Sequence, residues 1–114
     1  EEVAAEIKLT SRIISLDLSS MDELAALNEL LIENAPDIKL LVNCAGYGKS
    51  GSFDELEYSE QLGMIDVNCR ALTAVTKMCL PYISQNSRII ELASAAAFMP
   101  QPDFAVYAAT KAYV

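Results

Sequence analysis

Short apolar runs alternate along this chain with longer segments in which apolar residues recur at helical spacing. Residues 12–16, 38–42 and 87–93 are mostly apolar and short enough to be strands. The run 38–42 shows no alternation with polar residues, which is typical of a strand buried on both faces. Strands that alternate with helices form βαβ units with right-handed crossovers. We therefore expect an α/β fold built on a parallel sheet.

Start and stop signals place the helices between these strands. Ser20 followed by Glu23 is a capping-box pattern, which predicts a helix that runs to about residue 34 and ends before Pro36. A longer helix is expected over residues 59–80, because Pro81 marks its exit.

Two further helices are expected at the ends of the chain. Residues 1–7 have the pattern of the end of a helix, and Asp103 is the expected N-cap of a last helix that continues to the end of the chain. The pattern therefore covers the whole chain with one α/β arrangement.

The long helix has apolar residues on almost all sides. Over residues 62–80, four polar residues fall within one narrow stripe, and nearly everything else is apolar: Asp66, Arg70, Thr73 and Lys77. A helix of this kind should be covered on more than one side, by the sheet and by a helix of a second subunit. Asn68 points away from the stripe into the buried region, where an amide without partners would cost about 1–3 kcal/mol. By itself it is read as an amide tied to a neighbouring carbonyl.

Composition excludes several classes of function. The chain has 114 residues, enough for one domain, with 53% apolar residues and a net charge of −8. Its eight Lys and Arg are scattered, which argues against a nucleic-acid surface or an anionic membrane. Three cysteines without a C-x-x-C pair and the lack of histidine argue against a metal site. An acidic chain with an odd cysteine number and no signal peptide indicates the reducing cytoplasm.

The candidate chemistry lies in the last quarter of the chain. Tyr107 and Lys111 are spaced to share one face of a helix, a single turn apart. Ser94 follows a predicted parallel strand, at the edge where open α/β sheets place their sites. A phenol beside a fixed ammonium, with a hydroxyl nearby, can move a proton near neutral pH, as carbonyl reduction and alcohol oxidation require. Taken singly, the tyrosine and lysine could also be a surface pair, and the serine could be a loop serine or a strand-end cap.

A glycine-rich loop over residues 46–51 matches G-x-G-x-x-G and follows a predicted strand. We do not interpret it as a pyrophosphate loop, because no helix opens at these glycines. The acidic residue that should bind a ribose would be Asp66, which lies inside a helix. A P-loop is also rejected, since Asn43 stands where its first glycine should be.

Together these residues resemble the central part of a short-chain dehydrogenase/reductase. The matching pieces occur in the family's order: Asp17 and Leu18 after a strand, Asn43 to Gly46 after the next, Asn68 in the long helix, Ser94 after the third strand, and Tyr107 to Lys111. One position departs, because Cys44 stands where the family usually has a second asparagine.

The resemblance implies an NAD(P)-dependent oxidoreductase acting on a small carbonyl or alcohol substrate. Tyr107 would be the general acid/base, Ser94 would bind the substrate oxygen, and Asn68 would hold a proton-relaying water. Lys111 would support Tyr107 and bind the nicotinamide ribose.

The same resemblance implies which residues lie against NAD or NADP. Asp17 and Leu18 would flank the adenine, although a strand-end turn residue is nearly as good an interpretation of Asp17. Asn43, Ala45 and Gly46 would pass close to a ribose.

The family also places a strand with a glycine-rich cofactor loop before such a segment and a substrate loop after it. Residues 1–114 are then expected to be one partial Rossmann-like domain, with three strands of a doubly wound sheet and flanking helices. By themselves they should be inactive and bind cofactor weakly. Assembly as a dimer or tetramer is expected through the long helix and the Tyr107 helix. Two alternatives remain at this point: a non-catalytic α/β binding or regulatory module, and an extended-type nucleotide-sugar epimerase or dehydratase.

Overall fold

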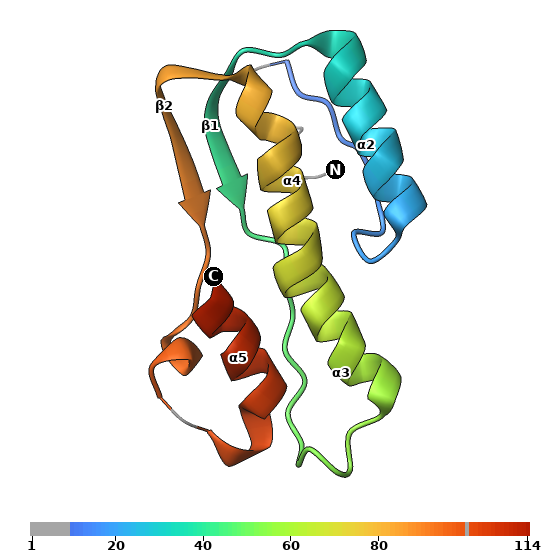
Figure 1. Ribbon diagram of the computed structural model, residues 1–114, viewed down its shortest axis with the longest axis vertical. Helices are drawn as coiled ribbons and strands as arrows, with labels where there is room; N and C mark the ends of the chain where they lie inside the picture. The colour runs from blue at the N-terminus through green and yellow to red at the C-terminus, as the bar shows by residue number, and fades with distance from the viewer. Residues whose placement is uncertain (1–9, 100) are drawn as a thin grey trace.

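The computed structural model describes residues 10–99 and 101–114, and its elements alternate between helix and strand (Figure 1). In chain order the helices and strands are α2 (Met21–Asn34), β1 (Ile38–Asn43), α3 (Tyr58–Ile65), the π-helical η1 (Asp66–Ala71), α4 (Leu72–Cys79), the 3-10 turn η2 (Leu80–Tyr82), β2 (Ile83–Glu91), the 3-10 turns η3 (Ala95–Ala97) and η4 (Pro102–Phe104), and α5 (Ala105–Tyr113). This order confirms the α/β class. The helix predicted over residues 1–7 lies outside the described residues.

The sheet in the described part of the chain has two strands, β1 and β2, which pair in parallel. Leu41 lies opposite Ile89 and Asn43 opposite Glu91. The prediction of a third strand at residues 12–16 is wrong, because no described segment pairs with it and a strand exists only by its hydrogen-bonded neighbour. Ile13 remains 60% exposed as a result.

β2 also begins earlier and ends earlier than the predicted run 87–93. It starts at Ile83, and the register with β1 shifts between Ile38 and Leu40. Asn86 has a φ of 72°, a left-handed conformation that asparagine tolerates better than most residues. The strand therefore bulges before it settles into register.

α3, η1 and α4 run on as one helix, which confirms the long helix predicted over residues 59–80 (Figure 1). The residues at both junctions, Asp66 and Leu72, keep right-handed helical angles. Pro81 lies in η2, just after the helix, as predicted. The π-helical turn in the middle was not predicted, and it places Asn68 at the widened part of the helix.

Capping explains where the other helices begin. The Ser20 hydroxyl accepts the Glu23 N–H at 3.3 Å, which confirms the predicted start of α2. The predicted N-cap of α5 is wrong. Asp103 lies within η4, and α5 begins after Phe104 with no side-chain cap, because the 3-10 turn leads directly into the helix.

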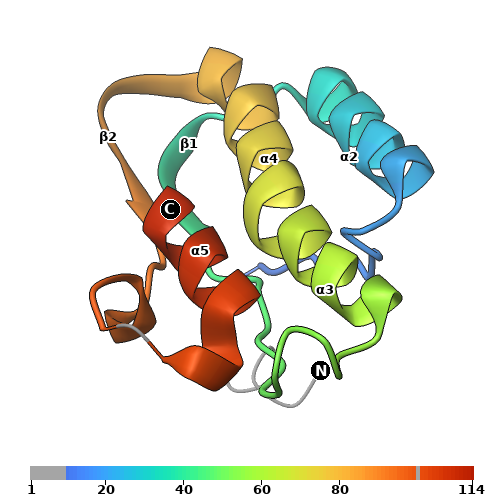
Figure 2. The same cartoon turned by 60° about the horizontal axis from the view of Figure 1, so that its bottom comes forward.

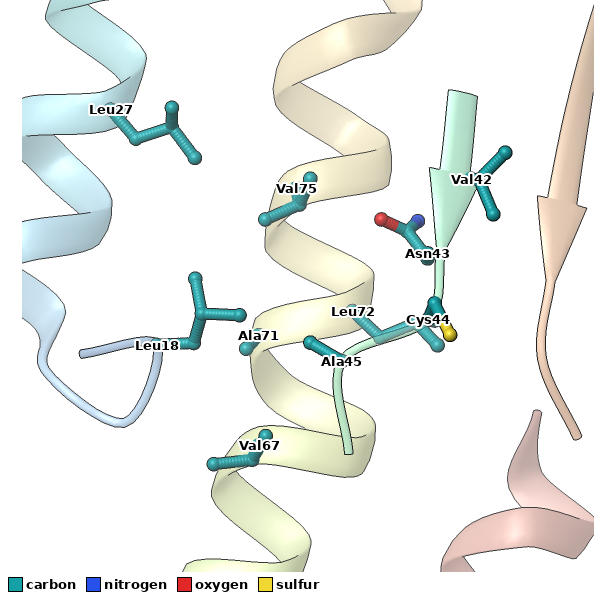
Figure 3. Close-up of a pocket in the computed structure, with 10 residues that line it drawn as sticks. All are labelled: Leu18, Leu27, Val42, Asn43, Cys44, Ala45, Val67, Ala71, Leu72 and Val75. Atoms are coloured by element: carbon teal, nitrogen blue, oxygen red, sulfur yellow. The ribbon is translucent and has the colours of Figure 1, made fainter. Parts of the chain in front are cut away.

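α4 packs on one face of the sheet and α2 packs on α4. Figure 3 shows the side chain of Asn43 pointing toward α4 and that of Val42 pointing away. The face turned away from α4 carries four exposed apolar side chains: Leu40, Val42, Ile90 and Leu92. Among the described helices, none is long and apolar enough to cross a membrane.

Candidate active site

Buried polar side chains mark the point where α5 meets the long helix. Asn68, Thr110 and Lys111 are the buried polar or charged residues of the described chain. Asn68 comes from η1 and the other two from α5. Figure 2 shows α5 beside the long helix, with the loop that leaves β1 passing between them. Burying polar groups is unfavourable unless they are hydrogen-bonded, so the partners of these three side chains are the first thing to establish at this junction.

Lys111 is a buried cation held by a backbone carbonyl. The residue is only 7% exposed, and Nζ donates to the carbonyl oxygen of Leu92 at 2.8 Å. No carboxylate of the described residues forms an ion pair with it. A buried ammonium without a carboxylate is unfavourable by itself, so its charge is available to a neighbouring group that becomes negative.

That neighbour is Tyr107, one helical turn earlier. Lys111 Nζ lies 6.0 Å from the centroid of the Tyr107 ring. The ring also packs edge-on against Phe104, with centroids 4.9 Å apart. The spacing predicted from sequence therefore brings the phenol and the ammonium to one place.

Asn68 is fully buried, and its amide clamps the backbone of the loop after β1. Its Oδ1 accepts the Tyr47 N–H at 3.0 Å, and its Nδ2 donates to the Tyr47 carbonyl at 2.8 Å. The second Nδ2 proton goes to Thr110 Oγ1 at 2.9 Å. The amide is thus hydrogen-bonded to a neighbouring carbonyl, the interpretation given above for Asn68 taken by itself.

Two glycines of the loop make room for these side chains. A Cβ on Gly46 would lie 2.9 Å from Asn68 Oδ1 and 3.3 Å from Lys111 Nζ. A Cβ on Gly48 would lie 2.7 Å from the Tyr107 ring. The G-x-G pattern therefore has a physical reason other than phosphate binding, namely close approach of the backbone to the buried cluster. The glycines are evident in the sequence, but this reason for them is not, because their neighbours come from distant segments.

Ser94 follows the end of β2 in extended conformation, and its Oγ accepts the Ala96 N–H at 3.2 Å. It therefore caps the 3-10 turn η3, which follows the strand. The hydroxyl proton is not used in that bond. No hydrogen bond of the described residues joins Ser94 to Tyr107 or Lys111. The Leu92 carbonyl that binds Lys111 nevertheless comes from the same strand end, and η3 packs against α5.

A cavity of about 210 Å³ opens between α2, the end of β1 and the long helix (Figure 3). Ten mostly apolar residues line it: Leu18, Leu27, Val42, Asn43, Cys44, Ala45, Val67, Ala71, Leu72 and Val75. The lining includes Leu18, Asn43 and Ala45, three of the residues expected near the cofactor. Tyr107, Lys111, Gly46 and Asp17 do not line it.

Asp17 lies in the turn before α2. Its carboxylate accepts the Ser19 hydroxyl at 2.6 Å and the Ser19 N–H at 2.9 Å. These bonds lower the pKa of Asp17 below its ordinary value, the hydroxyl bond more than the backbone bond. Both contacts of the Asp17 carboxylate are thus local, with a residue two positions along the same turn.

One polar cluster beside the cavity was missed by sequence analysis. Asn43 Nδ2 donates to Thr76 Oγ1 at 2.8 Å and to Glu91 Oε1 at 3.1 Å. Glu91 Oε2 is buried and has no hydrogen-bond partner among residues 10–99 and 101–114. In the sequence, Glu91 lies between Ile90 and Leu92, and nothing there indicates these contacts. They are invisible in the sequence because the partners of Glu91 lie on β1 and α4.

Comparison with known proteins gives one consistent result. The family model described as short chain dehydrogenase matches residues 1–114. An uncharacterized oxidoreductase of Staphylococcus epidermidis is 30% identical over 99% of this chain and 50% of its own length. A bulky-bulky ketone specific alcohol dehydrogenase from Comamonas testosteroni superposes with a TM-score of 0.85 at 29% identity, covering 99% of this chain and 46% of that one.

A short-chain dehydrogenase from Sphingobium yanoikuyae, solved in complex with NADPH, also gives a TM-score of 0.85, at 30% identity over 99% of this chain and 45% of that one. The chain spans about half the length of the curated relatives it matches first.

Proposed function

The chain belongs to the short-chain dehydrogenase family, and from that premise we propose that the protein carrying it is an NAD(P)-dependent oxidoreductase. It would transfer a hydride between a nicotinamide cofactor and a small carbonyl or alcohol substrate. One observation carries the proposal. Lys111 is a buried ammonium with no carboxylate partner among the described residues, and it lies one turn from the phenol of Tyr107.

Tyr107 is the proposed general acid/base. A bound nicotinamide supplies or accepts the hydride at the substrate carbon. The Tyr107 hydroxyl gives its proton to the carbonyl oxygen during reduction and takes it back during oxidation. Lys111 stabilises the negative charge that then develops on the phenol oxygen, and burial strengthens this attraction because little water screens it.

Ser94 and Asn68 complete the proposed set. The Ser94 proton is free to be donated to the substrate oxygen, since only the oxygen of this hydroxyl is used by the Ala96 N–H. Asn68 has both amide protons engaged, so a relaying water would bind the second lone pair of its Oδ1.

NAD or NADP would contact several segments of the chain. The apolar cavity of about 210 Å³ is smaller than the 300–1,000 Å³ typical of a whole-ligand site, so it suits one ring of a dinucleotide. Leu18, Asn43 and Ala45 would line this part, with Asp17 and Gly46 nearby. Tyr107 and Lys111 would contact the nicotinamide ribose. Because the cavity takes only part of the cofactor, residues 1–114 alone would bind it weakly and be inactive.

We also propose a dimer or tetramer formed through the long helix and α5. A groove between these helices supports it, and Ile65 in its wall is 43% exposed. Six further residues line it: Cys69, Arg70, Thr73, Ala74, Lys77 and Tyr113.

The test of the proposed reaction is Tyr107→Phe in the full-length protein that carries this sequence. Removing the hydroxyl should lower kcat by about 10²- to 10⁴-fold, the usual contribution of a general acid/base, while cofactor affinity stays largely intact. Turnover is measured by NAD(P)H absorbance across a panel of ketones and alcohols, and affinity by NAD(P)H fluorescence. Tyr58→Phe, at an exposed tyrosine at the start of α3, is the matched control. Substantial activity in Tyr107→Phe would remove the residue from this role.

A further inference from the structure

We infer that Thr110 is a positioning residue whose hydroxyl orients the Asn68 amide and thereby holds the loop after β1 against Tyr107 and Lys111. The expected effect of Thr110 on turnover rests on the proposed function. The claim that Thr110 orients the Asn68 amide rests on the hydrogen bonds alone.

The Thr110 hydroxyl has one proton, and that proton is already used. Oγ1 donates to the Tyr107 carbonyl at 2.7 Å, one turn earlier in α5. Toward Asn68 the hydroxyl can therefore only accept, and it accepts an Nδ2 proton at 2.9 Å. Thr110 is 3% exposed, so water does not replace either bond.

This constraint decides which way the Asn68 amide points. With Nδ2 directed at Thr110, its second proton meets the Tyr47 carbonyl and Oδ1 meets the Tyr47 N–H. A reversed amide would set a carbonyl oxygen against the hydroxyl oxygen and break both bonds to Tyr47. The hydroxyl and the Tyr47 backbone thus select the same orientation, and each reinforces the other.

The clamped residue is the centre of the close approach described above. Tyr47 lies between Gly46, whose backbone passes Lys111 Nζ, and Gly48, whose backbone rests on the Tyr107 ring. If the clamp loosens, the loop can move away from both side chains. Thr110 therefore acts on the site through Asn68 and the loop, without touching the reacting atoms.

The alternative is a purely local role, because the hydroxyl of a threonine within a helix commonly donates a hydrogen bond to a carbonyl one turn earlier. By itself that bond would only bend or slightly destabilise α5 and would not affect the loop after β1. The bond from Asn68 distinguishes the two cases, since it joins residues 42 positions apart from two different helices.

The experiment uses two variants of the full-length protein. Thr110→Val keeps the shape and removes the hydroxyl, whereas Thr110→Ser keeps the hydroxyl and removes a methyl group. We expect kcat to fall about 10- to 100-fold in Thr110→Val, as displacement of a site by a fraction of an ångström to 1 Å can do, with KM nearly unchanged. Thr110→Ser should recover kcat to within about threefold of wild type, because the hydroxyl restores the contact.

Amide hydrogen exchange gives a second measurement that needs no activity. The Tyr47 N–H should exchange faster in Thr110→Val than in wild type or Thr110→Ser, because its acceptor is Asn68 Oδ1. The Leu24 N–H, bonded to the Ser20 carbonyl at 3.1 Å in α2, is the internal control and should not change.

The outcomes separate the two claims. Unchanged Tyr47 exchange in Thr110→Val overturns the positioning role, as does an equal loss of kcat in both variants. The wild-type protein could instead show no oxidoreductase turnover while the Tyr47 N–H exchanges faster in Thr110→Val. That result would support the positioning role and refute the proposed function.

Discussion

Replacing Gly48 by alanine tests whether the loop after β1 positions the proposed general acid/base. The new methyl group would lie 2.7 Å, 2.9 Å and 3.0 Å from three atoms of the Tyr107 ring. The shortest of these is about 0.7 Å below the 3.4 Å at which ordinary contact begins. A ring cannot bend away from the contact, so either Tyr107 or the loop must move by about that distance.

The size of the effect follows from this displacement. Overpacking a well-packed contact costs about 1–3 kcal/mol, and the cost should lie at the low end here because Gly48 is exposed and Tyr107 is half-buried. Gly48 does not need a left-handed backbone, so alanine also stabilises the fold by about 0.4–1 kcal/mol through the unfolded state. The net loss of stability should therefore be about 0–2 kcal/mol. A shift approaching 1 Å at the reacting group costs much more in rate, about 10-fold or above in kcat.

The assay compares kcat and thermal unfolding in the full-length protein for Gly48→Ala and a matched control, Gly51→Ala. Gly51 has a φ of +153°, and a Cβ there would lie 2.9 Å from Leu56, away from Tyr107. Strain of this kind costs about 1–3 kcal/mol, so Gly51→Ala should lose stability at least as much. It should keep kcat within about twofold, since a twofold change in rate is only ~0.4 kcal/mol of barrier.

Two results would refute the reasoning. One is wild-type kcat in Gly48→Ala, which would mean that the loop and the Tyr107 ring separate without consequence. The other is the same loss of kcat in both variants, which would show that general destabilisation, and not the position of Tyr107, lowers the rate.

Two further predictions concern stability. Asn68→Ala leaves the Tyr47 N–H and carbonyl without their buried partner, and unfolding in urea should show a loss of about 2–4 kcal/mol; a loss under 1 kcal/mol would contradict a structural clamp. The lowered pKa of Asp17 means that its bonds to Ser19 add stability above the ordinary aspartate pKa of 3.8, and that this stability is lost as the pH falls through the lowered value. Asp17→Asn should therefore be less stable than wild type at pH 7, with the difference closing in acid; a difference that stays constant with pH would rule this out.

Local patterns in the sequence determined the elements that depend on near neighbours. Ser20 caps α2 through a bond three residues along the chain, and Pro81 follows the long helix because proline cannot continue it. Tyr107 and Lys111 share a face because four residues make about one helical turn. The alternation of short apolar runs with helical segments predicted the α/β class, which the parallel pair β1 and β2 confirms.

Only the tertiary structure decided what these elements meet. The bond between Asn68 and Thr110, the Leu92 carbonyl at Lys111 and the Glu91 cluster join segments whose separation carries no periodic signal. The same reason explains two of the predictions that were wrong. A strand at residues 12–16 needs a neighbouring strand to pair with, and no described segment supplies one. Asp103 does not cap α5 because it lies inside the 3-10 turn η4, which comes directly before that helix. Spacing fixes which residues can share a face, but close packing in three dimensions fixes which partner each one finds.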